Sequence, residues 1–230
     1  MSQQKWIRQT NLSEFEKEAQ DMNKDPYRIA ARTYDLFAEP LQSRVRKTGL
    51  ELFPPRDNLS ILDVGCGTGT QLALYNRTGC KLYGVDTSPA MLARAQRKLG
   101  ETAELHLEDA SHMNFPSQMF DLVSALLVIH EMPASLRPAV LTECKRMAKT
   151  DGRIMVVDWH LGPYPFPMGY AWRLVRRWFE ITGGRQHYAN YCDFKKRGGL
   201  APLIDGAHLS VDKQRVVHPY GTIIVYLLKP

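Results

Sequence analysis

The feature that most restricts how this chain can fold is an apolar stretch that runs directly into a glycine-rich turn. Residues 61–70 are ILDVGCGTGT, with glycine at positions 65, 67 and 69. Glycine lets the backbone turn tightly and lets a ligand approach the main-chain N–H groups at the start of the following helix. A short buried strand, such a turn and then a helix predict a nucleotide-binding βα unit.

From Leu59 onward the chain alternates between apolar strand patterns and amphipathic helix patterns. Alternation with helices of this length indicates parallel βαβ units. The short turn HPYG should make the last two strands antiparallel. We expect an α/β, doubly wound (Rossmann-like) fold with a seven-stranded sheet, mostly parallel with an antiparallel last strand, and helices on both faces. The predicted strands are 61–64, 81–86, 103–107, 120–129, 153–158, 209–217 and 221–228, and the predicted helices are 88–100, 133–152 and one near 197–206.

With 230 residues, the chain has room for one well-packed domain. Four parts of this domain are expected: an N-terminal helical cap, a cofactor-binding core, a cap insertion, and the C-terminal strands. In the first part, capping patterns at Ser13 and Asp25 begin two helices, and Glu39-Pro40 should break the second before helical spacing resumes. The insertion should hold a helix at 170–181 and then a Gly/Tyr-rich loop. The four parts are 1–55, 59–158, 159–198 and 199–230.

Acidic residues follow the predicted strands where a ligand would bind. Asp86 ends the second strand, 21 residues after Gly65, where a carboxylate accepts hydrogen bonds from ribose hydroxyls. Asp63 precedes the first glycine and suits a cationic partner, such as the amino group of a methionine moiety. Asp109, after the third strand, could accept from an adenine amino group or could simply cap a turn. The GxGxG spacing does not meet the GxGxxG fingerprint of dinucleotide-binding enzymes.

Taken together, the segments ILDVGCGTGT, GVDTSPAML, EDA and FDLVSALLVIHEMP resemble the motifs of class I S-adenosylmethionine-dependent methyltransferases. The resemblance covers about 59–158 and implies S-adenosyl-L-methionine as the cofactor. It also implies which residues contact each part of this cofactor. These are Asp63, Gly65, Gly67 and Gly69 for the methionine end, Asp86 for the ribose, Thr87 and Met91 beside the adenosine, Asp109 and Ala110 near the adenine, and Leu126 lining the cofactor.

Within that class, the chain resembles the ubiquinone and menaquinone C-methyltransferases and the bacterial phosphatidylethanolamine N-methyltransferases. The residues behind this resemblance are Tyr34-Asp35, the run LALY at 72–75 and the ending GTIIVYLLKP. The motif IHEMP and the segment 159–198 depart from these groups. The resemblance implies a small or amphiphilic acceptor, such as a quinol or an aminophospholipid. A soluble metabolite or natural-product methyltransferase is the alternative, and an NAD(P)-binding oxidoreductase is a remote one.

Methyl transfer needs a general base only where the acceptor must lose a proton. His130 and Glu131 follow the fourth strand, at the sheet edge where such folds bind ligands, and are the candidate bases. A buried structural histidine is an equally weighted alternative for His130. Tyr34 is a third catalytic candidate, because by resemblance the N-terminal helix closes over the cofactor. The four cysteines show no metal-ligand spacing, and no metal is expected.

The net charge is +6, and +5 of it falls between Arg153 and Leu200. A local basic face suits an anionic or membrane-bound acceptor. In the helix at 170–181, Trp172, Val175, Trp178 and Phe179 should share one face, with arginines opposite. This pattern fits a helix in peripheral contact with a membrane, or a cap helix that packs its aromatic side chains on the core.

Several classes of partner and location are not expected. No base-flipping motif or RNA-binding module is evident, so nucleic acid is not an expected partner. The first 20 residues contain no apolar segment typical of a signal peptide. We therefore expect a cytoplasmic protein, with the possibility of membrane-peripheral contact.

Overall fold

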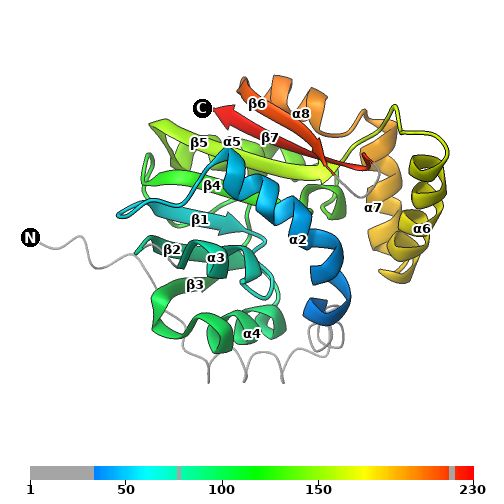
Figure 1. Ribbon diagram of the computed structural model, residues 1–230. Coiled ribbons are helices and arrows are strands. Elements are labelled where there is room, and N and C mark those ends of the chain that lie inside the picture. Colours follow the sequence, from blue (N-terminus) through cyan, green and yellow to red (C-terminus); the bar gives the residue numbers. More distant parts are fainter. Residues whose placement is uncertain (1–33, 77–78, 218–220) are drawn as a thin grey trace, which may run out of the picture.

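The computed structural model describes residues 34–76, 79–217 and 221–230 and contains one seven-stranded sheet (Figure 1). The strand order is β3-β2-β1-β4-β5-β7-β6. The first five strands in this order, β3-β2-β1-β4-β5, are parallel to one another. Strand β7 is antiparallel to both β5 and β6. The expected doubly wound fold is therefore confirmed. The strands are β1 (Ser60–Val64), β2 (Lys81–Asp86), β3 (Ala103–Leu107), β4 (Phe120–Leu126), β5 (Ala148–Trp159), β6 (Ser210–Val217) and β7 (Ile223–Lys229).

Helices cover both faces of the sheet, and each face has its own apolar cluster. Helices α2 (Tyr34–Leu52), α3 (Thr70–Tyr75) and α4 (Pro89–Leu99) pack on one face. Helices α5 (Arg137–Met147) and α8 (Leu200–Gly206) pack on the other. Short 3-10 turns occur at η3 (Gly100–Thr102) and η4 (Ile129–Glu131). Because helices cover both sides, the central strands β1 and β4 are buried along most of their length, as parallel strands usually are.

Helix α4 shows how closely local sequence rules set the elements around the glycine turn. Ser88 is its N-cap, with Oγ accepting a hydrogen bond from the backbone N–H of Met91, and Pro89 occupies the first turn. Gly100 ends the helix with a positive φ of 59°, a conformation in which glycine carries no Cβ penalty. The predicted helix 88–100 is thus confirmed within one residue at each end.

Two predicted boundaries in the second half of the core were wrong. The apolar run 120–129 does not form one strand, because Leu127 has a φ of 55° and the chain turns there into η4. Ile129 is nonetheless fully buried, so apolar content could not distinguish a strand from a buried turn. The predicted helix 133–152 ends at Met147, because Ala148 already pairs with Phe120 at the start of β5.

Two predictions for the caps were also wrong. Helix α2 passes through Pro40 without the expected break. The predicted loop after residue 181 is a helix, α7 (Arg185–Lys196), which buries Tyr191 and Phe194 at a spacing of three residues. The two N-terminal helices expected from Ser13 and Asp25 begin outside the described residues.

Helices α6 (Met168–Thr182) and α7 stand together beyond the carboxyl ends of the parallel strands (Figure 1). They follow β5 and precede α8, so the expected cap insertion lies over the edge of the sheet where the glycine turn opens. In the part of the chain that the structure describes, none of the helices has the length and hydropathy needed to cross a bilayer.

Candidate functional site

A cavity of about 280 Å³ opens at the carboxyl ends of β1, β2 and β4. Strand β1 pairs with β2 on one side and with β4 on the other, both in parallel, so the order in which successive strands join the sheet reverses here. Open α/β sheets bind their ligands at such a switch point. The cavity brings together eight of the residues expected to bind the cofactor: Gly65, Gly67, Asp86, Thr87, Met91, Asp109, Ala110 and Leu126.

Asp86 joins the glycine turn to the start of α4. Its Oδ2 accepts from the backbone N–H of Gly67 and its Oδ1 from that of Ser88, each at 2.8 Å. These two bonds leave further lone pairs on the carboxylate oxygens, which can accept from hydroxyls of a ligand in the cavity. The Asp86 carboxylate therefore holds the glycine turn in shape and also lines the cavity.

The three glycines of the turn have different surroundings, although all three adopt a positive φ. A Cβ on Gly67 would meet no atom within 4 Å, which leaves this position open on the cavity side. A Cβ on Gly69 would lie 2.8 Å from Leu99 Cδ1 and 3.1 Å from Ala95 Cβ. Gly69 does not line the cavity, and its role is the close packing of the turn against α4.

Asp63 lies behind the cavity wall, not in it. It is 3% exposed, and its Oδ1 accepts a hydrogen bond of 2.6 Å from the Ser124 hydroxyl. Burial raises the pKa of this carboxyl to about 6, against the lowering effects of the Ser124 hydrogen bond and the nearby Arg46 charge. A buried carboxylate of this kind is stabilised when a cation comes close.

Asp109 has the turn role that the sequence analysis left open. Its Oδ1 accepts from both the backbone N–H and the hydroxyl of Ser111, at 2.8 and 2.7 Å. Asp109 nevertheless lines the cavity beside Ala110. An adenine contact is thus compatible with its position, while its oxygens also organise the loop after β3.

His130 lies among acidic side chains at the end of β4. It is 3% exposed, with Nδ1 at 2.8 Å from Asp158 Oδ1 in an ion pair that is not aligned as a hydrogen bond. Burial opposes protonation of the ring, but the charges of Asp158, Glu180 and Glu131 outweigh it and raise the pKa of His130 to about 9. A ring that is protonated at neutral pH does not suit the expected role of general base.

Glu131 lines the cavity, and its backbone is held by side chains that the sequence analysis missed. The Asn190 amide of α7 donates to the Glu131 carbonyl. The Arg137 guanidinium is 1% exposed and donates to the carbonyls of Met132 and Asn190 and to the Asp193 carboxylate. Arg137 thus fastens α5, the η4 loop and α7 together. No local motif marks it, because two of its three partners, Asn190 and Asp193, lie more than 50 positions away along the chain.

Of three further residues, Tyr34, Asp158 and His160, the structure describes the side chains of the last two, and these do not line the cavity. Tyr34 is the first residue of α2, and its side chain falls outside the described part of the structure. Asp158 is fully buried and accepts from the backbone N–H groups of His130 and Trp159. His160 contacts the Gly221 carbonyl through Nδ1 at 2.9 Å, which is a structural contact in the loop between β5 and α6.

Residues 62–156 match the family model described as "Methyltransferase domain". This match coincides with the part of the chain that carries the glycine turn, Asp86 and the cavity. The core therefore matches a methyltransferase domain, in agreement with the resemblance of its motifs to class I S-adenosylmethionine-dependent methyltransferases. The cavity fits this cofactor, since it offers a carboxylate at the end of β2 and an open glycine backbone in the turn.

Two curated relatives and one solved structure describe the similarity further. The chain is 31% identical over 134 residues to a phosphatidylethanolamine N-methyltransferase of Cereibacter sphaeroides, covering 56% of this chain and 64% of that protein. It is 27% identical over 164 residues to a demethylmenaquinone methyltransferase of Beutenbergia cavernae, covering 66% and 67%. A TehB-like SAM-dependent methyltransferase from Corynebacterium glutamicum shares the fold, with a TM-score of 0.60 at 16% identity over 87% of this chain and 98% of that one.

These alignments leave about a third of each curated relative uncovered. The methyltransferase domain family agrees with the GxGxG spacing in favouring a methyltransferase over the oxidoreductase alternative.

Proposed function

We propose that this chain transfers the methyl group of S-adenosylmethionine to an amphiphilic acceptor that it meets at a membrane surface, of the quinol or aminophospholipid type. We further infer that residues 1–230 act as one domain, with 159–198 as the acceptor-side cap. The observation that carries the proposal is the exposed face of α6.

An apolar row on α6 points into solvent. Tyr170, Leu174, Trp178 and Ile181 are spaced by three or four residues and therefore share one face. Leu174 is 69% exposed and Trp178 is 62% exposed. The expected grouping, in which Trp172 and Trp178 share an apolar face, is thus wrong for Trp178, which lies in the outward row with Leu174.

Cationic and apolar residues continue this surface. Arg173 and Arg177 are exposed on the same side of α6. Phe166 and Met168, just before the helix, are 86% and 50% exposed. Basic residues around a solvent-facing apolar row are typical of helices that lie in the interface of an anionic bilayer.

Helix α6 lies next to the proposed reaction site. Its buried Glu180 is 3.6 Å from His130 Nε2, and α6 packs on α7, which holds the Glu131 loop. An acceptor that leaves the membrane at the outer face of α6 would thus need to pass only the cap helices α6 and α7 to reach the cavity. Both curated relatives are named as enzymes of lipid-like acceptors, a phospholipid and a menaquinone precursor, which supports the same acceptor class.

Within the site, we propose Glu131 as the group that accepts a proton where the acceptor must lose one. It lines the cavity and is 25% exposed, so a substrate in the cavity can reach it. The proposed cofactor contacts are those of the cavity wall, with Asp86 on the ribose and Asp63 acting through its charge on the methionine end.

The test compares vesicle binding of the wild-type chain with that of the double variant Arg173→Glu/Arg177→Glu. Two charge reversals at an anionic surface should weaken partition by about 30-fold or more. The matched control is Arg44→Glu/Lys47→Glu, two exposed residues on α2, which should leave partition nearly unchanged. Vesicles contain phosphatidylglycerol alone or with a quinol or phosphatidylethanolamine, and methyl transfer is measured with labelled cofactor.

Failure of the wild-type chain to bind anionic vesicles would refute the membrane part of the proposal. Equal methylation of short water-soluble acceptors and of vesicle-borne ones would favour the soluble-metabolite alternative. Loss of vesicle binding in the α2 control would point to a diffuse charge effect and not to α6.

A further inference from the structure

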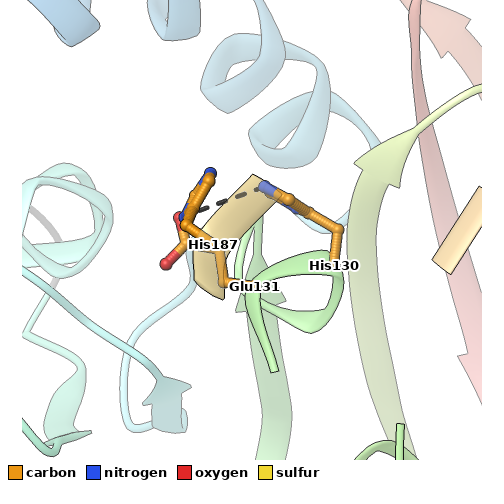
Figure 2. Close-up of side chains that lie close together, drawn as sticks. All are labelled: His130, Glu131 and His187. Atoms are coloured by element: carbon orange, nitrogen blue, oxygen red, sulfur yellow. Dashed lines mark ion pairs between the residues drawn. The ribbon is translucent and has the colours of Figure 1, made fainter. Parts of the chain in front are cut away.

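Four side chains from three elements converge beside the cavity and form what we call the histidine–carboxylate cluster: His130, Glu131, Glu180 and His187. They come from η4, α6 and α7, and Figure 2 shows the first two together with His187. One ligand-type atom from each of His130, Glu131 and His187 lies within 4.8 Å of the others. Glu180 joins them, because its Oε2 is 2.7 Å from His187 Nε2.

The free nitrogen of His130 faces this cluster without a hydrogen bond among the described residues. Its Nε2 is 3.6 Å from Glu180 Oε1 and 4.0 Å from Glu131 Oε1. Both distances are too long for a hydrogen bond. Two atoms that each lie about 2.1 Å from one tetrahedral ion are about 3.4 Å apart. The 3.6 Å distance to Glu180 is therefore close to that between two ligands of a single metal ion, and the 4.0 Å distance to Glu131 is somewhat longer.

Asp158 supplies the second sphere that metal-ligating histidines usually have. Its fully buried carboxylate lies 2.8 Å from His130 Nδ1 and also accepts the His130 backbone N–H. A carboxylate on Nδ1 fixes the ring and leaves Nε2 as the ligating atom. The ring is further confined by Trp159, Tyr191 and Phe194.

The region around His130 contains three carboxylates, and a bound cation would stabilise them. Asp158 and Glu180 are buried, and Glu131 is three-quarters buried. Three carboxylates gathered in a partly dry region repel one another unless positive charge offsets them. A divalent ion would offset two of these three negative charges, and it would replace the proton of the His130 ring, because only a neutral imidazole ligates a metal.

We propose that the histidine–carboxylate cluster binds one divalent first-row transition-metal ion, through His130 Nε2, the carboxylates of Glu131 and Glu180, and the His187 ring. Mixed imidazole and carboxylate ligands suit zinc, manganese, iron and cobalt better than magnesium or calcium. This site was not predicted from the sequence, because its two histidines, His130 and His187, lie far apart in the chain and follow no spacing motif.

The position of the cluster gives the ion a role on the acceptor side. Glu131 belongs to the cluster and also lines the cofactor cavity. A metal held there would lie beside the space where an acceptor oxygen or phosphate must sit. It could bind and orient that anionic group, while the cofactor half of the site would keep its own contacts.

The test uses the full-length chain after chelator treatment, titrated with Co²⁺ and followed by visible absorption, then displaced with Zn²⁺ and quantified by elemental analysis. We expect one ion per chain. His187→Ala and Glu131→Gln remove partly exposed ligands and should each weaken Co²⁺ affinity by at least about tenfold. His112→Ala, which removes an exposed imidazole elsewhere, is the matched control and should bind like the wild type.

Retention of less than one ion in ten chains, or equal affinity in the wild type and Glu131→Gln, would overturn the proposal. Circular dichroism checks that His187→Ala is folded, and if it is not, Glu131→Gln alone decides. Cofactor binding is measured on the same samples. A chain that binds the metal but no S-adenosylmethionine would refute the proposed function and leave the metal site standing, and the reverse result would do the opposite.

Discussion

The two halves of the site are built in different ways. On the cofactor side, Gly67, Asp86 and Ser88 lie within 21 residues of one another and form a turn held by backbone N–H groups. On the acceptor side, Arg137, Asn190 and Asp158 bring η4, β5 and α7 together over long stretches of chain. The first half depends on local geometry, and the second depends on a network of long-range side-chain contacts. Variants that affect one half and spare the other test this difference.

The largest effect is expected from Asp86→Ala. This change removes the acceptor of two backbone hydrogen bonds and the proposed ribose contact. Charged hydrogen bonds of this kind contribute about 1.5–3 kcal/mol each, so affinity for S-adenosylmethionine should fall by about 1,000-fold in calorimetric titration. Asp151→Asn, at an exposed position in β5, is the control. If Asp86→Ala binds S-adenosylmethionine as tightly as the wild type, Asp86 does not bind the ribose. The cofactor side of the site then does not depend on this local turn.

A smaller effect on stability is expected from Arg137→Met. Methionine keeps much of the buried volume but loses the bonds to Met132, Asn190 and Asp193. Two carbonyls then lack their charged donor, which costs about 3 kcal/mol of the free energy of unfolding. Urea denaturation measures this loss, and hydrogen exchange should become faster in α7 while the glycine turn stays protected. Uniformly faster exchange in both halves would show that they are not separable.

The smallest effect concerns Asp63 and depends on pH. Burial raises the pKa of its carboxyl to about 6, so the folded chain keeps a proton that the unfolded chain releases above its ordinary value of 3.8. Stability therefore falls as pH rises between these two values and stays lower above them. The shift corresponds to at most roughly 3 kcal/mol. Burying an asparagine should offset about half of this.

Asp63→Asn should therefore raise the free energy of unfolding of the cofactor-free chain by about 1.5 kcal/mol near pH 7.5. Near pH 4 it should lower it by about 1 kcal/mol, because the wild-type carboxyl is then protonated in the folded chain and the cost of burying the asparagine remains. Its affinity for S-adenosylmethionine should fall, because the charge that favours the methionine end is gone. Thermal unfolding at the two pH values measures the first effect. If the variant changes the free energy of unfolding by the same amount at both pH values, Asp63 is ionised in the folded chain without a free-energy cost.

The part of the molecule that could be predicted from sequence is the part with local rules. The mostly parallel sheet and helix α4 follow from turn chemistry and strand periodicity within short segments. The eight cavity residues follow from these local signals together with the resemblance to methyltransferase motifs. The end of β4 escaped prediction because an apolar residue with positive φ looks the same in sequence as one in a strand. Helix α7 escaped because its aromatic residues were assigned to a loop on composition alone.

The acceptor side could not be predicted for a related reason. His130 and Glu131 were found because they follow a strand, but Glu180, His187 and Arg137 reach them only through tertiary packing. Position along the chain carries no information about such contacts. The solvent-facing row of α6 was likewise missed, since helical spacing shows which residues share a face but not which face is outward.

The placement of β7 sets an order of events on a growing chain. Strand β6 pairs with β7, while β7 itself lies between β6 and β5. During synthesis the strands β1 to β5 can therefore assemble first, with the edge of β5 open and β6 already made but without its neighbour. An open apolar edge of this kind invites pairing with other chains. Docking of residues 223–229 is thus the step that closes the sheet, and a chain in which β1 to β5 have assembled without β7 leaves this edge open.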